Sequence, residues 1–320
     1  MTAAPLVSIL IPAFNAGPWI NASVGSAIEQ SHERCEIIVV DDGSSDETLA
    51  RGQKIASRFP DRVKVMSQIN AGAAAARNHA LRLARGEYIQ YLDADDLLSR
   101  DKIKLQLEIL ARSPAHALAT CRWGRFHDSP ADARFVDDEV FRDFEPIEWI
   151  IAHAAHLKMI HPAAWLVPRE VAERAGEWDE SLTLNDDGEY FARVTLASAG
   201  LRFTTDPAAA SYYRSGLSGS LSDRKSLTAL QSLHHTGELL QSHLFAASDR
   251  PETRQAMADH WQHLCYELYP DAPILSRDAA KRSHALGGST VSPPLGGRQK
   301  LVARLFGWRA ARRWASIIRR

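Results

Sequence analysis

The chain has 320 residues, enough for one large α/β domain with an appendage or for two modest domains. It is 45% hydrophobic and 24% charged, and its formal net charge of −1 excludes a protein that binds nucleic acid through a uniformly basic surface. The three cysteines, Cys35, Cys121 and Cys265, show neither metal-site nor disulfide spacing, so we expect a reducing, cytoplasmic compartment. We also expect no signal peptide, and no membrane-spanning helix because no run of about 18 apolar residues is present.

In the N-terminal third, short apolar runs alternate with helical patterns, which predicts a doubly wound, mostly parallel sheet flanked by helices. Ligands of such sheets bind beyond the carboxyl ends of the strands. Polar residues follow each expected strand, so we expect one ligand site there. The expected strands are 6–12, 36–40, 63–66 and 88–92, with helices at 18–30 and 73–84, and the polar clusters are Asn15, Asp41 and Asp42, 70–77, and Asp93 with Asp95.

Three carboxylates, Asp93, Asp95 and Asp96, follow the strand at 88–92. Mutually repelling anions are costly at a strand end unless a cation or hydrogen-bond donors offset them. Mg²⁺ or Mn²⁺ carrying phosphates would do so, because both ions favour oxygen ligands. The alternative is an Asp-rich turn that caps a helix starting near Leu97.

The turn after the first strand, 12–17, lacks the G-x-G-x-x-G pattern of a dinucleotide site, and the chain has no P-loop. What remains is a nucleotide-type fold whose phosphates are held through a metal. Arg77 could supply a guanidinium to a phosphate or carboxylate. Its alternative is a surface arginine paired with Glu87 or solvent.

Four segments, 7–15, 41–48, 70–78 and 93–96, resemble in order and spacing the motifs of the family 2 inverting glycosyltransferases of GT-A fold, of the bacterial cell-surface polysaccharide type. The resemblance covers about 6–215. It implies that Asp93 and Asp95 hold ribose and a Mn²⁺ or Mg²⁺ ion on the donor diphosphate. It also implies a nucleotide-sugar site, with UDP as the usual nucleotide, formed by Pro12, Ala13, Phe14, Asn15, Asp42, Asn70, Gly72, Arg77, Asp93, Ala94, Asp95, Asp186 and Arg214.

A second acidic cluster, Asp186, Asp187 and Glu189, stands just before an expected helix at 190–199. These acids could simply be favoured at a helix N-terminus by the macrodipole. Inverting sugar transfer instead needs a carboxylate that takes the proton of the acceptor hydroxyl. The resemblance, which extends to 161–165 and 178–182, implies that Asp187 is this base and puts Asp186 where the family more often has Glu.

Farther along, we expect a helix at 102–110, a strand at 117–123, an irregular loop at 129–143 and an amphipathic helix at 144–157 that carries His153 and His156. That helix either lines the acceptor cleft or supplies histidines to a metal. The Gly- and Ser-rich segment 212–222 is expected to be mobile and to close over phosphates, with Arg214 near the diphosphate. The family often has a metal-binding histidine where this chain has Gly216.

These patterns divide the chain into a glycosyltransferase domain at 1–222, a helical extension at 223–284, a linker at 285–297 and a basic amphipathic tail at 298–320. The domain has a nucleotide-sugar half (1–110) and an acceptor half (111–222). The tail holds eight Arg and Lys residues and no acid, which leaves the rest of the chain at −9. Basic residues with tryptophan favour an anionic membrane surface; a solvated or partner-bound helix is the alternative, and we expect no nucleic-acid partner.

The sequence therefore predicts an inverting, metal-assisted hexosyltransferase that moves a sugar to a hydroxyl of a glycan or lipid-linked glycan, in the cytoplasm or on the inner face of the plasma membrane. One alternative is a sugar-phosphate nucleotidyltransferase, which normally has a basic Gly-rich loop where 13–17 has no cation. Another is a non-catalytic nucleotide-sugar-binding protein, which would bind a donor without turnover.

Overall fold

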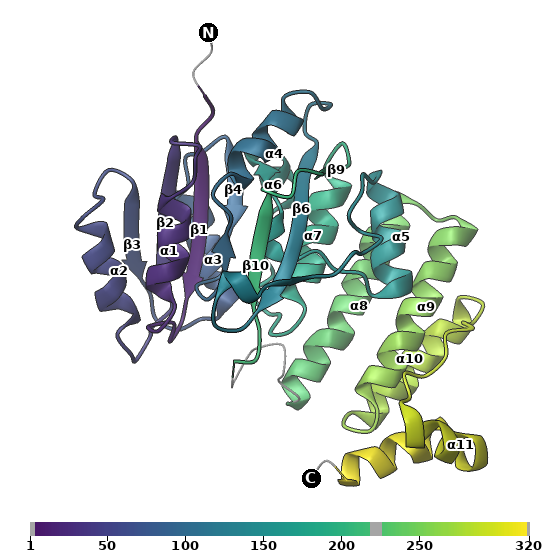
Figure 1. The fold of residues 1–320 in the computed structure, drawn as a ribbon. Helices are drawn as coiled ribbons and strands as arrows, with labels where there is room; N and C mark the ends of the chain where they lie inside the picture. The colour runs from purple at the N-terminus through teal and green to yellow at the C-terminus, as the bar shows by residue number, and fades with distance from the viewer. Residues whose placement is uncertain (1–3, 218–225, 319–320) are drawn as a thin grey trace. The chain divides into compact units, whose positions relative to one another are not determined.

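The computed structural model describes residues 4–217 and 226–318 (Figure 1). The chain divides into two compact units. The sheet unit consists of Met1–Pro146, Met159–Ser181 and Asp186–Ser218. The helical unit consists of Ile147–Lys158, Leu182–Asn185 and Gly219–Arg320.

The first sheet of the sheet unit has the strand order β3-β2-β1-β4-β8. The first four of these strands are parallel, and the short β8 runs antiparallel to β4. Every residue of β1 and β2 is buried, which is the expected property of strands covered on both faces. The strands are β1 (Val7–Ala13), β2 (Cys35–Asp41), β3 (Val63–Ser67), β4 (Tyr88–Tyr91) and β8 (Val167–Pro168), and the helices between them are α1 (Ile20–Ile28), α2 (Thr48–Ala56) and α3 (Ala73–Leu83).

A second sheet has the order β5-β10-β6-β7, with β9 also paired to β6. Its longer strands run parallel, whereas β5 and β7 are antiparallel. A bridge between Ala119 and Leu166 links β6 to the segment before β8. The α/β fold with mostly parallel strands is thus confirmed, but its strands form two sheets. They are β5 (Leu97–Leu98), β6 (Leu118–Phe126), β7 (Arg134–Phe135), β9 (Leu201–Thr204) and β10 (Ala210–Arg214).

One alternative and one local expectation are wrong, whereas the helix expected at 102–110 is confirmed as α4. Leu97 does not begin a helix: Leu97 and Leu98 pair with β10, and α4 (Lys102–Leu110) begins only after this short strand. The segment expected to be a mobile loop from Tyr212 onward is strand up to Arg214. The part of that loop at 218–222 lies outside the described residues.

Helices complete both units. The expected C-terminal helical region is present, and within it α10 packs on α9. No helix in the described ranges is both long and apolar enough to cross a membrane. The remaining elements are the 3₁₀ turns η1 (Pro130–Asp132) and η2 (Pro162–Ala164), and the helices α5 (Pro146–His156), α6 (Arg169–Ala175), α7 (Asp186–Leu196), α8 (Leu227–Ala247), α9 (Pro251–Leu268), α10 (Pro273–Ala285) and α11 (Gly297–Ile318).

An amine is buried beneath β4. Lys102, at the start of α4, has no exposed surface, and its Nζ donates to Gln90 Oε1 and to Gln106 Oε1 at 2.5 Å. Burial lowers the pKa of Lys102 from 10.5 to about 8. The surrounding neutral acceptors satisfy the ammonium group without a counter-charge, so the charged form is destabilised in the folded chain.

We expect the stability of the wild type to rise with pH relative to a Lys102→Met variant. Between pH 8 and 10.5 the unfolded chain binds one more proton at Lys102 than the folded chain, so the free energy of unfolding increases across that window. The gain is of the order of 3 kcal/mol. Urea unfolding at a series of pH values measures this gain in the free energy of unfolding. The matched control is Lys104→Met, which replaces an exposed lysine of the same helix. Parallel pH curves for the wild type and Lys102→Met would contradict the prediction.

Candidate functional site

The loops that follow β1, β2 and β3 are tied together at the carboxyl ends of these strands. Asp42, after β2, accepts hydrogen bonds from the backbone N–H groups of Ala71 (2.9 Å) and Gly72 (2.8 Å) and from the side chain of Asn70 (3.1 Å). Gly72 has a φ of 97°, which favours glycine there. Asn15, after β1, accepts from the backbone N–H of Ser45 at 2.9 Å. These bonds hold the three loops in fixed positions at one edge of the sheet.

The expected donor-site residues of β1 and its loop differ in accessibility. Pro12 and Ala13 are buried within the strand, whereas half of Phe14 is exposed. Asn15 is exposed and has a φ of 49°. Phe14 and Asn15 are therefore the parts of this segment that a ligand could reach.

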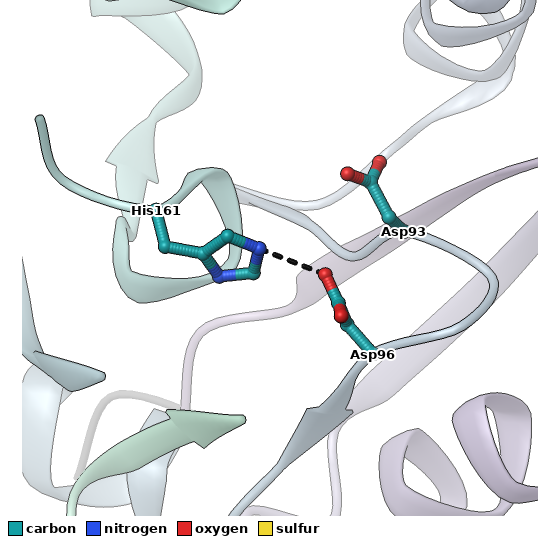
Figure 2. A group of neighbouring side chains, drawn as sticks. All are labelled: Asp93, Asp96 and His161. Atoms are coloured by element: carbon teal, nitrogen blue, oxygen red, sulfur yellow. Dashed lines mark ion pairs between the residues drawn. The ribbon is translucent and has the colours of Figure 1, made fainter. Parts of the chain in front are cut away.

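The acidic turn after β4 holds three carboxylates in different surroundings. Asp96 is fully buried: its Oδ1 accepts the backbone N–H of Arg214 at 2.7 Å, and its Oδ2 lies 2.8 Å from His161 Nε2 (Figure 2). Asp93 is partly exposed and accepts from Arg77 Nη2 at 2.9 Å. For Asp95, no side chain within 4–217 or 226–318 donates to the carboxylate. Burial, with the charges of Asp96 and Asp93 nearby, raises the pKa of Asp95 to about 7.

Arg77 joins this turn to the second acidic cluster. Its buried guanidinium donates to Asp93 and, through Nη1, to Asp186 at 2.8 Å, and it lies 4.4 Å from the ring centre of Trp178. Burial alone would lower the pKa of Arg77, but these two anions outweigh it and raise the pKa, so Arg77 is permanently charged. The alternative of a surface arginine paired with Glu87 is wrong, because Glu87 instead accepts the backbone N–H of Leu6 at 3.0 Å.

Asp187 lies beside this arginine, in the first turn of α7. The acids expected just before the helix are therefore part of it. Asp187 Oδ1 accepts the backbone N–H of Gly188 at 2.9 Å. Burial and the neighbouring Asp186 raise the pKa of Asp187 to about 6, while Arg77 opposes the shift. Asp187 is thus ionised at neutral pH and yet unusually basic for an aspartate.

Arg214, at the end of β10, donates two side-chain hydrogen bonds to main-chain carbonyls. Its Nε donates to the backbone carbonyl of Asp95 at 2.9 Å and its Nη1 to that of His127 at 2.6 Å, while the guanidinium packs on Phe126 at 4.3 Å. Arg214 therefore fixes the acidic turn through the main chain. Its contact with a diphosphate stays a prediction.

Sequence reasoning missed His161 and Asp96 as members of the site. Asp96 stands in the motif, and His161 precedes the Pro162 of a segment that had been noted, but their pairing spans two distant parts of the chain. Together with Asp93 they form a group whose ligand atoms lie within 4.8 Å of one another. Asp96 Oδ2 and both ring nitrogens of His161 are buried and make no hydrogen bond of normal geometry.

These donors fit a divalent cation. Carboxylate oxygens suit Mn²⁺ and Mg²⁺, and a neutral imidazole is a common metal ligand. Asp95 adds a carboxylate without a side-chain partner next to them. The two histidines of α5 are not part of any such group among the described residues. His153 Nδ1 lies 2.6 Å from the backbone carbonyl oxygen of Lys158, so this imidazole already has a hydrogen-bond partner within the helical unit.

A mostly parallel sheet with acids and metal-type ligands at the carboxyl ends of its strands defines an α/β protein of the nucleotide-binding class. The model of Glycosyl transferase family 2 matches residues 8–174, just over half of the chain. The chain belongs to glycosyl transferase family 2.

Known proteins resemble part of the sequence or the fold. A chondroitin synthase of Pasteurella multocida is 34% identical over 190 residues, which are 58% of this chain and 19% of the synthase. S. aureus TarS 1–349 in complex with UDP-GlcNAc shares the fold at a TM-score of 0.59 and 17% identity, covering 89% of this chain and 93% of that one. The mannosyltransferase PcManGT of Pyrobaculum calidifontis, in complex with GDP-Man and Mn²⁺, has a TM-score of 0.57 and 20% identity, covering 98% and 84%. The chain spans 19% to 61% of the length of the first curated relatives it matches.

Proposed function

We propose that the protein is an inverting glycosyltransferase that moves a sugar from a nucleotide diphosphate sugar, a UDP-sugar, to a hydroxyl of a glycan or lipid-linked glycan. The observation that carries the proposal is the double ion pair of Arg77, which brings Asp93 of the motif turn and Asp186 beside Asp187 to one point. A donor-binding turn and a candidate base are thereby adjacent. The complexes of TarS with UDP-GlcNAc and of PcManGT with GDP-Man and Mn²⁺ support a nucleotide-sugar donor.

In this proposal the loops held by Asp42 and Asn15 receive the nucleoside, and the acidic turn receives the diphosphate. Asp93, Asp95, Asp96 and His161 are the residues that would hold Mn²⁺ or Mg²⁺. When bound, such an ion stabilises the negative charge that develops on the leaving nucleoside diphosphate.

Asp187 would take the proton of the acceptor hydroxyl as that oxygen attacks the anomeric carbon from the face opposite the diphosphate. Its raised pKa makes it a better base than a solvent-exposed aspartate while leaving it ionised at pH 7. Displacement from the opposite face inverts the configuration of the sugar. Arg77 keeps Asp93 and Asp186 paired and limits the rise in the pKa of Asp187.

The proposal is tested by release of nucleoside diphosphate from UDP-, GDP- and dTDP-sugars in the presence of Mn²⁺, Mg²⁺ or EDTA. We expect metal-dependent release from one donor, lost with EDTA and reduced about 10²-fold or more in Asp95→Asn, since a metal ligand or its neighbour is removed. The exposed Asp61→Asn is the matched control and should behave as the wild type. Donor binding without release, even with acceptor extracts, would show a binding protein instead. A lack of binding by any donor would overturn the site.

We also propose that transfer takes place in the cytoplasm at the inner face of a membrane, because the tail at 298–320 is basic and carries tryptophan and other apolar side chains. A lipid-linked acceptor would then meet the domain at the surface that carries it. Cell fractionation of the wild type tests the location: recovery in the membrane fraction that is reversed by salt is the expected result.

A further inference from the structure

Helix α11 contains a break that gives its two halves different surroundings. Gly307 has a φ of 79° and a ψ of 162°, outside the helical region, so the element consists of an N-terminal segment, 297–306, and a C-terminal segment, 308–318. A positive φ of this kind favours glycine. The element lies at the yellow, C-terminal end of the chain in Figure 1. The expected single amphipathic tail is therefore two short helices.

The C-terminal segment is fixed to α9 within the helical unit. The ring of Trp308 lies 4.9 Å from that of Tyr266 and 5.3 Å from that of Tyr269, and Ala311 is fully buried. Arg312 Nη2 donates to the carbonyls of Tyr266 (2.8 Å) and Tyr269 (3.2 Å), at the end of α9. A cation at these carbonyls satisfies acceptors that the helix leaves open. Trp308 and Arg312 therefore make contacts within the helical unit.

The N-terminal segment instead presents apolar side chains outward. Leu301 is 64% exposed, Leu305 72% and Phe306 73%. Leu301 and Leu305 are four residues apart and share one helix face, whereas Val302 and Ala303 are half-buried on another. The leucine face is therefore not the face by which this segment packs on its own unit.

Exposed cations flank these leucines. Arg298, Lys300 and Arg304 are all exposed, and none forms an ion pair with a described residue. The chain has no Asp or Glu from 297 to 320. An apolar stripe bordered by basic side chains on both sides matches a surface that is anionic outside and apolar just beneath, which is the chemistry of a membrane containing acidic lipids.

We propose that residues 298–306 form a lipid-binding surface for anionic membranes. Leu301 and Leu305 enter the boundary between headgroups and acyl chains, and the three cations contact headgroup phosphates. Segment 308–318 acts as the fixed base that holds this surface to the helical unit. The inference goes beyond the transfer reaction and specifies which half of the tail contacts lipid. It can hold or fail independently, because lipid binding is measured without a donor.

The test is co-sedimentation of the full chain with phosphatidylcholine vesicles that do or do not contain phosphatidylglycerol. The wild type is expected to sediment with the anionic vesicles, to be released by salt, and to remain in solution with neutral ones. We expect Leu301→Gln/Leu305→Gln and Arg298→Gln/Lys300→Gln/Arg304→Gln each to weaken binding about tenfold or more. The matched control removes three exposed lysines elsewhere, Lys64→Gln/Lys104→Gln/Lys281→Gln, and should bind as the wild type.

Three results would overturn the proposal. Equal binding to neutral and anionic vesicles, or no binding to either, would show that the surface does not recognise anionic lipid. Equal loss in the lysine control shows that net charge alone is responsible. A dimer in light scattering that dissociates in Leu301→Gln/Leu305→Gln assigns the leucine face to a second copy of the chain. Far-ultraviolet circular dichroism of each variant verifies that it is folded, and nucleoside diphosphate release, measured separately, reports the transfer reaction.

Discussion

Replacement of Asp187 by Asn is expected to lower the kcat of sugar transfer by roughly 10²- to 10⁴-fold while donor binding changes little. The amide is nearly isosteric and its oxygen can still accept the N–H of Gly188, so the first turn of α7 is retained. It cannot take a proton from the acceptor hydroxyl. The loss should therefore appear in turnover and not in the dissociation constant of the donor.

Donor binding by calorimetry and initial rates of nucleoside diphosphate release measure the two quantities on the same preparation. Asp137→Asn, an exposed aspartate of the sheet unit, is the control. Equal rates for Asp187→Asn and the control would remove Asp187 from the reaction. Lost donor binding in Asp187→Asn would give it a ligand-binding role instead.

The pH dependence of turnover is a second test of Asp187 as the base that takes the acceptor proton. Because burial and Asp186 raise the pKa of Asp187 to about 6, the carboxylate becomes protonated as the pH falls through that value. Only the ionised form can accept a proton, so kcat should fall about tenfold per pH unit below 6. This acidic limb should be missing from the residual activity of Asp187→Asn.

Much of the first sheet followed from the sequence because its strands are covered on both faces. The buried runs of β1 and β2 contain few polar residues, and such runs are recognised by composition alone. The short strand β5 could not be predicted from the sequence, because it depends on a distant partner strand. Leu97 and Leu98 form a strand only because β10, more than a hundred residues later, supplies their partner.

The same distinction applies to the site. The residues of the motif turn and the acids at 186–187 could be identified from sequence, because each group is local. Their joint attachment to Arg77 could not, since Asp93 and Asp186 lie on segments that only the fold brings together. The pairing of Asp96 with His161 has the same origin: a buried carboxylate needs a cation, but no spacing rule indicates which distant side chain will supply it.

Loss of the Arg77 guanidinium should damage both stability and function. In Arg77→Gln the amide can donate to one carboxylate at most, which leaves Asp93 or Asp186 without its cation beside the partly buried Asp187. Breaking a buried ion pair of this kind costs about 3–5 kcal/mol. The pKa of Asp187 should also rise further, because Arg77 is the charge that opposes its increase.

Urea unfolding and donor binding of Arg77→Gln measure these effects, and Arg82→Gln on the same helix is the matched control. Arg82 is exposed and pairs with Glu177 at the surface, so its loss should cost no more than about 1 kcal/mol. Arg77→Lys separates charge from geometry: one ammonium cannot reproduce two divergent N–H contacts, so we expect partial recovery of stability and little recovery of turnover. Equal stability of Arg77→Gln and Arg82→Gln would mean that the two acidic clusters are held in place without Arg77, and the proposed link between the donor turn and the base would fail.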